Sequence, residues 1–206
     1  MRSVHALAVA LLLLSGSAGQ AFSSATRIDV QRDGGTYFVR ASADVPADLS
    51  IAWGTLTDYE RLPEFVPDIH RVRVLARDGN RLTISFDGGF RLLFFEWPVR
   101  VRLAVRHEPY GRVLAQSDPG PVDGEPPTLR QFSGRYSLAV IPVAGRAGVR
   151  LDYDAQFELT EAMPPLIGML FGRPLVRAML RTQFEAMLRE IERRQAAGPL
   201  LERSTS

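Results

Sequence analysis

The chain has 206 residues, of which 46% are hydrophobic and 23% charged, and its formal net charge is +2. This composition is typical of a folded globular protein, and the small charge argues against a nucleic-acid partner. The chain contains neither cysteine nor lysine, which excludes disulfides, thiolate sites and lysine Schiff-base chemistry.

The first residues have the layout of a secretory signal peptide. Arg2 and His5 precede an apolar run at residues 6–14, and small residues follow it. The run is shorter than the roughly 20 residues that a membrane-spanning helix needs. We therefore expect a signal peptide at residues 1–21, with cleavage after Ala21 or alternatively after Ala25, while an uncleaved anchor is the other interpretation. Export without cysteine favours a bacterial periplasm.

Alternation of apolar and polar residues predicts antiparallel strands with one buried face. It is clearest at residues 97–105 and 149–159. Shorter runs lie at residues 37–43, 72–74, 82–86, 113–115 and 132–140. Three Asp-Gly pairs in the first half, at 33–34, 78–79 and 87–88, are typical of hairpin turns because both residues tolerate positive φ. We expect about seven strands in one sheet.

Two short helices are predicted after the first strand. Pro46 suits the first turn of a helix, where its missing N–H costs nothing. Leu49, Trp53 and Leu56 then share one helix face. Asp58 is expected to cap a second short helix, which ends before Pro67.

A long helix is predicted from the two prolines at 164–165 to about Ala197. Its apolar stripe is formed by Val176, Leu180, Phe184, Met187 and Ile191. The Gly-Arg-Pro sequence at 172–174 should kink or divide this helix, since proline removes a backbone hydrogen bond. Residues 198–206 are expected to form a disordered tail.

The order of these elements predicts an α+β fold. A single sheet cannot bury its apolar face alone, and only one long helix is available to cover it. We therefore expect a curved antiparallel sheet wrapped around the C-terminal helix, in a single domain at residues 27–197. Such a wrap can leave a cavity between the sheet and the helix.

Two motifs resemble a known family. Residues 53–69 read WGTLTDYERLPEFVPDI, and residues 132–136 read FSGRY. Both resemble the polyketide cyclase/dehydrase and coenzyme-Q-binding family of the START-like (SRPBCC) superfamily, whose fold is called helix-grip. The resemblance implies that the cavity binds a polyketide, quinone or lipid, and that only some members catalyse cyclisation or dehydration. The predicted export signal distinguishes this chain from the mitochondrial quinone-binding branch of the family.

The candidate ligand-binding residues are large apolar side chains expected to point toward the cavity. They are Trp53, Tyr59, Phe65, Phe86, Phe95, Trp97, Tyr136, Tyr153, Phe157, Met169 and Phe184. Tyr59 and Phe65 would guard its mouth, unless the motif serves only to form a turn. The hydroxyls of Tyr136 and Tyr153 would be its sparse polar anchors. Packing in a filled core is the alternative for the whole aromatic set.

Only three residues are candidates for catalysis: Glu96, Tyr136 and Tyr153. Alternation directs Glu96 to the outer face of its strand, where Arg100 or Arg102 can pair with it. A bulge would instead turn Glu96 inward as a general acid or base.

The sequence contains no motif for metal binding, nucleophilic catalysis or nucleotide binding. His70 and His107 are expected in turns, and no HxH or HExxH spacing exists. The chain also lacks GxSxG, GxGxxG and Walker-type motifs. We therefore predict no metal and no cofactor.

The sequence thus predicts an exported START-like protein that holds a hydrophobic small molecule, whether lipid, quinone or polyketide-like. A cyclase or dehydratase acting on the bound molecule is one alternative. A non-catalytic component of the cell envelope is another, with peripheral membrane contact through Arg177 and Arg181. The identity of the ligand and the oligomeric state stay open.

Overall fold

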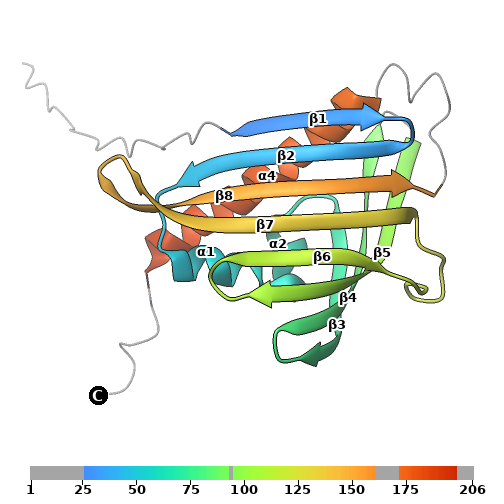
Figure 1. The fold of residues 1–206 in the computed structure, drawn as a ribbon, viewed down its shortest axis with the longest axis horizontal. Coiled ribbons are helices and arrows are strands. Elements are labelled where there is room, and N and C mark those ends of the chain that lie inside the picture. The colour runs from blue at the N-terminus through green and yellow to red at the C-terminus, as the bar shows by residue number, and fades with distance from the viewer. Residues whose placement is uncertain (1–25, 93–94, 161–171, 199–206) are drawn as a thin grey trace, which may run out of the picture.

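The computed structural model describes residues 26–92, 95–160 and 172–198. Within these ranges, eight strands form one antiparallel sheet in the order β1-β2-β8-β7-β6-β5-β4-β3. The strands are β1 (Arg27–Asp33), β2 (Thr36–Val45), β3 (Ile69–Asp78), β4 (Arg81–Leu92), β5 (Phe95–Glu108), β6 (Arg112–Asp118), β7 (Leu129–Val143) and β8 (Arg146–Leu159). The sheet curves, and a long helix crosses one of its faces (Figure 1).

Four helical segments accompany the sheet. They are α1 (Leu49–Leu56), the short 3-10 helix η1 (Tyr59–Arg61), α2 (Leu62–Phe65) and α4 (Gly172–Ala197) within the described ranges. In Figure 1, α1 and α2 lie on the same side of the sheet as α4. The predicted α+β fold, a curved antiparallel sheet around a C-terminal helix, is confirmed.

One strand was missing from the sequence prediction. All seven expected runs lie inside β2 to β8, whereas β1 pairs with β2 at the edge of the sheet and precedes them. The two short helices therefore follow the second strand rather than the first. Only Ile28 and Val30 of β1 are buried, so its alternation is too short to stand out.

Two of the three Asp-Gly pairs lie at hairpin turns. Gly34 and Gly79 each have a φ of +55°, between β1 and β2 and between β3 and β4. The prediction was wrong for the pair at 87–88, which lies inside β4. A Cβ atom at Gly88 would lie 2.5 Å from the carbonyl oxygen of Asp68, so this glycine allows the close approach of another segment.

The starts of the short helices also differ from expectation. Helix α1 begins at Leu49 after Asp48, so Pro46 lies before the helix and not in its first turn. Asp58 precedes η1 but forms no side-chain hydrogen bond that caps it. Its carboxylate instead accepts a hydrogen bond from Arg194 of α4 at 2.9 Å, because a guanidinium is a stronger partner than a backbone N–H.

Helix α4 buries its predicted apolar stripe against the sheet. Val176, Phe184, Met187 and Ile191 are buried, and Leu180 packs partly against them. Each such side chain contributes about 1.5–3 kcal/mol when fully buried. The helix ends at Ala197 as predicted, followed by Gly198 with a φ of +63°. No helix in the described ranges is long and apolar enough to cross a membrane.

Several predictions fall on residues outside the described ranges. These are the signal peptide with both cleavage sites, the prolines at 164–165, Met169 and the tail at 199–206. The backbones of Phe95, Glu96 and Trp97 belong to β5, but the orientations of these side chains lie outside the description.

Candidate functional site

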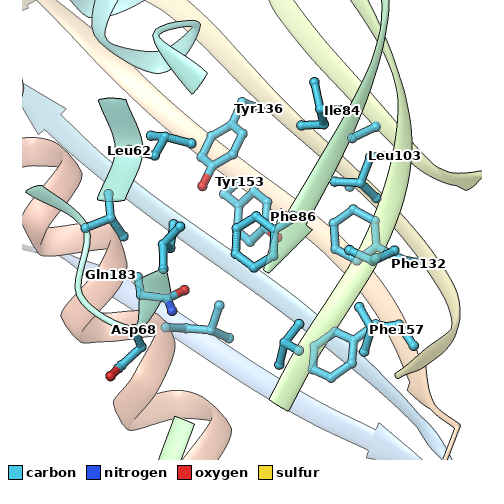
Figure 2. Close-up of a pocket in the computed structure, with 18 of the residues that line it drawn as sticks. Leu62, Asp68, Ile84, Phe86, Leu103, Phe132, Tyr136, Tyr153, Phe157 and Gln183 are labelled. Carbon is cyan, nitrogen blue, oxygen red and sulfur yellow. The ribbon is translucent and has the colours of Figure 1, made fainter. Parts of the chain in front are cut away.

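A cavity of about 240 Å³ lies between the concave face of the sheet and the helices. Its walls come from α1, η1, α2, strands β3 to β8 and α4. The larger lining side chains include Leu56, Tyr59, Leu62, Ile84, Phe86, Leu103, Phe132, Tyr136, Tyr153, Phe157, Met179, Leu180, Gln183 and Met187. Figure 2 shows the aromatic side chains across the middle of the cavity and Gln183 on the α4 side. The site is thus built mainly from hydrocarbon.

A row of small residues hollows the sheet beneath this cavity. Ala115, Gly134 and Ala155 face one another across β6, β7 and β8. Tyr136 and Tyr153 form the neighbouring row on one side, while Phe132 and Phe157 form it on the other. A Cβ atom at Gly134 would lie 2.8 Å from the Phe132 ring. The missing side chain at Gly134 therefore makes room for the Phe132 ring, which lines the cavity.

Tyr136 and Tyr153 are the central polar groups of the site. Their rings stack with centroids 4.4 Å apart. Neither hydroxyl has a hydrogen-bond partner among the residues that the structure describes. Burial raises the pKa of both phenols well above the ordinary value of 10.0. Both hydroxyls therefore stay protonated near neutral pH and can donate a hydrogen bond.

A second polar pair lies at the edge of the cavity. The hydroxyl of Tyr59, which lines the cavity, lies 2.6 Å from Nε2 of His107. Trp53 packs edge-on against the same imidazole at 5.4 Å. Burial is the main cause that lowers the pKa of His107 below 6.5, and the nearby Arg77 adds to it. His107 lies in β5, so its predicted position in a turn was wrong.

An ionic cluster holds the η1–α2 segment against α4. Arg194 donates to Asp58 at 2.9 Å and to Glu190 at 2.7 Å, and Arg193 donates to the same glutamate at 2.6 Å. The guanidinium of Arg194 also lies 5.5 Å from the centre of the Phe65 ring. We call Asp58, Glu190, Arg193 and Arg194 the Glu190 cluster. It fixes η1 and α2, which carry Tyr59 and Leu62 into the cavity wall.

Asp68 and Gln183 are the polar residues of the wall between α4 and the start of β3. Asp68 is exposed and has a φ of +63°. The side-chain amide of Gln183 donates to the carbonyl oxygen of Pro67 at 3.4 Å. Because Asp68 is exposed and also lines the cavity, this wall is where the cavity approaches solvent.

The structure brings five of the eleven candidate ligand-binding residues to the cavity wall: Tyr59, Phe86, Tyr136, Tyr153 and Phe157. Three others lie elsewhere. Trp53 packs on His107, Phe65 packs on Arg194, and Phe184 is buried in the core. Contact with a ligand stays a prediction for all of them.

Sequence reasoning missed several lining residues. Phe132 has the same inward parity on β7 as Tyr136, so alternation could have found it. Met179 and Gln183 flank the α4 stripe one helical turn apart, a position that the stripe alone does not reveal. Asp68 depends on the path of the chain into β3, for which the sequence carries no local signal.

The other charged candidates do not meet at a site. His70 is exposed on β3, and Arg177 and Arg181 are exposed on α4. Among the described residues, no group of three or more His, Asp or Glu side chains is placed to hold a metal ion.

Comparison with known proteins settles the family. The sequence profile described as "Polyketide cyclase / dehydrase and lipid transport" matches residues 45–184, which is more than half of the chain. The chain belongs to this family. No curated protein sequence matches it. The profile includes the η1–α2 segment, the row of small residues and the first half of α4, so the polyketide cyclase/dehydrase match spans most of the cavity wall.

Several solved structures of bacterial proteins share the fold. A protein of Thermus thermophilus, TTHA0849, has 21% identity and a TM-score of 0.57, covering 78% of this chain and 97% of that one. The STAR-related lipid transfer protein of Xanthomonas axonopodis has 13% identity and a TM-score of 0.58, covering 80% and 98%. The Zhui aromatase/cyclase of Streptomyces sp. R1128 has 18% identity and a TM-score of 0.55, covering 79% and 98%. At these identities the likeness shows the fold alone.

Proposed function

We propose that the chain binds a small hydrophobic molecule in the cavity between the sheet and α4. The observation that supports this is the cavity itself, about 240 Å³ enclosed mainly by aliphatic and aromatic side chains. Protein interiors otherwise pack at the density of organic crystals, with few voids larger than a water molecule. An apolar cavity with a few polar groups is the ordinary form of a ligand site.

The volume indicates the size of the ligand. The cavity volume of about 240 Å³ lies just below the range of about 300–1,000 Å³ that is usual for ligand pockets. A compact molecule of one or two rings fits this space better than a whole long-chain lipid.

Filling the cavity tests the proposal. Ala115 lines the cavity and Ala104 is exposed on the outer face of β5, so the same change to phenylalanine at each gives a matched pair. We expect the neutral dye phenylnaphthylamine to bind the wild type and Ala104→Phe, with a rise in its fluorescence, and not to bind Ala115→Phe. Native mass spectrometry of the purified protein should also find an apolar ligand that Ala115→Phe lacks. Equal dye binding by both variants would contradict the proposal.

A cyclase or dehydratase acting on the bound molecule is the second candidate. The observation that favours it is the 2.6 Å contact between Tyr59, at the cavity wall, and His107. A neutral imidazole can accept the proton that a tyrosine hydroxyl relays from a substrate. A β-hydroxy ketone that bears a phenyl group is a suitable probe, because loss of water gives a conjugated enone that absorbs in the near ultraviolet. Activity lost in both Tyr59→Phe and His107→Gln, with dye binding kept, would support the enzyme.

We also propose that residues 1–21 direct export to the periplasm, on the basis of their sequence pattern. In a Gram-negative host, the intact mass of the periplasmic protein should correspond to cleavage after Ala21 or Ala25. Replacing Leu11 and Leu12 with arginine should keep the protein in the cytoplasm. A full-length mass in the cytoplasm of the wild type would contradict export. Peripheral membrane contact through Arg177 and Arg181 stays a prediction.

A further inference from the structure

The described wall of the cavity carries few polar side chains, and most of them are tyrosines. Besides the hydroxyls of Tyr59, Tyr136 and Tyr153, the polar side chains of the described wall are Asp68 and Gln183, both on the wall that approaches solvent. Tyr59 is already paired with His107, and Gln183 with the carbonyl of Pro67. The groups left for a ligand in the interior are therefore Tyr136 and Tyr153.

These two hydroxyls are positioned as donors. They extend from directly opposed residues of β7 and β8, and their rings stack at 4.4 Å. Figure 2 shows the Tyr136 hydroxyl on the side of its ring that faces Leu62. Each phenol has one hydrogen to donate, and burial favours the protonated form. Since neither hydroxyl is paired within the described residues, each is free to donate to an acceptor on a ligand.

The described wall of the cavity also contains no cation. No arginine or histidine belongs to its described wall, and Asp68 is acidic. A ligand carboxylate would lose its hydration here without gaining a counter-charge, which is strongly unfavourable.

We propose, building on the proposed function, that the cavity selects a neutral, ring-shaped molecule whose carbonyl oxygen accepts hydrogen bonds from Tyr136 and Tyr153. Phe86, Phe132 and Phe157 supply flat apolar surface around this pair. The carbonyl lies against the two hydroxyls and the ring lies against the three phenylalanine side chains. Carboxylates of the same size are disfavoured because none of the described wall residues carries a positive charge.

Three matched probes test this class: tetralone, its hydrocarbon analogue tetralin, and tetralin carboxylate. Each competes against phenylnaphthylamine on the wild type, Tyr136→Phe and Tyr153→Phe. Both variants keep the stacked rings and lose only a hydroxyl. One lost hydrogen bond should weaken tetralone about two- to twelvefold, and tetralin should change less than about twofold. The carboxylate should bind about tenfold or more weakly than tetralone at neutral pH and gain affinity as acid protonates it.

An infrared spectrum adds a readout that needs no variant. The carbonyl stretching band of tetralone bound to the wild type should lie at lower frequency than in hexane, and should move back in the double variant. If the dye binds but tetralone affinity and its carbonyl band are the same in wild type and variants, the carbonyl inference is wrong while the proposed function stands. If neither dye nor probes bind the wild type, both fail.

Discussion

Tyr59 and His107 show how one hydrogen bond ties the cavity wall to the sheet. The two residues are far apart in sequence, and their 2.6 Å contact joins η1 to β5. Burial favours the neutral imidazole, so its Nε2 can accept the tyrosine hydrogen while the stacked rings exclude water. A charged His107 would have to donate to the tyrosine oxygen instead, and burial together with Arg77 disfavours that form.

His107 should therefore make stability depend on pH. Its folded pKa lies below the ordinary 6.5, so the unfolded chain binds a proton first as the pH falls. The free energy of unfolding should decrease from about pH 6.5 downward until the folded pKa is passed. Urea unfolding at a series of pH values should show this decrease in the wild type and a smaller one in His107→Gln. The exposed His70→Gln is the control and should retain the wild-type slope; equal slopes in all three would contradict the assignment.

At the scale of elements, β4 depends on a glycine in its interior. Gly88 pairs with Ile69 while the carbonyl of Asp68 passes directly over it. This contact sets where β3 begins, and Asp68 and Ile69 there both line the cavity.

Gly88→Ala should therefore destabilise the protein. The added methyl would meet backbone rather than a movable side chain, and overpacking of this kind costs about 1–3 kcal/mol. Gly54→Ala is the matched control: Gly54 lies in α1 with open space at its Cβ position, so alanine there should stabilise by about 0.5–1 kcal/mol. Thermal and urea unfolding of both variants measure the difference. A neutral Gly88→Ala would show that the chain relaxes around the contact.

The same glycine shows what sequence can and cannot predict. Strands β2 to β8 could be predicted because long runs such as residues 149–159 must alternate to bury one face. An Asp-Gly pair, however, looks the same whether it needs a positive φ, as Gly79 does, or a missing Cβ, as Gly88 does. The inward direction of Tyr136 and Tyr153 could be predicted from the alternation within each strand. The contact of Tyr59 with His107 joins segments far apart in sequence, so no local pattern indicates it.

At the scale of the whole molecule, the Glu190 cluster connects α4 to the segment formed by η1 and α2. Glu190 has a side chain only 7% exposed and receives hydrogen bonds from two arginines. The hydrogen bonds from Arg193, which has the larger effect, and from Arg194 lower the pKa of Glu190 from 4.5 to about 2, although burial alone would raise it. Asp48 and Gln195 make a further contact between the start of α1 and the end of α4. The helix is thus held at its C-terminal end by polar contacts and along its length by the core.

Glu190→Gln should destabilise the fold by about 1–3 kcal/mol at pH 7, because it weakens charge-assisted hydrogen bonds. The stabilisation is fully present above pH 4.5 and is lost as the pH falls toward 2. The difference in unfolding free energy between wild type and variant should therefore shrink over that window. Glu64→Gln removes an exposed ion pair with Arg61, which solvent screens, and should change stability much less. Equal effects of the two substitutions would contradict a structural role for the cluster.

The cavity has a mechanical consequence as well. Unfolding under hydrostatic pressure is driven by the elimination of internal void volume, and a space of about 240 Å³ is a large contribution for one sheet and one helix. Protein stripped of ligand should therefore unfold at lower pressure than Ala115→Phe, whose added ring occupies that space. Tryptophan fluorescence in a pressure cell measures both midpoints. A bound ligand would fill the same space, so its release would lower the pressure at which the protein unfolds.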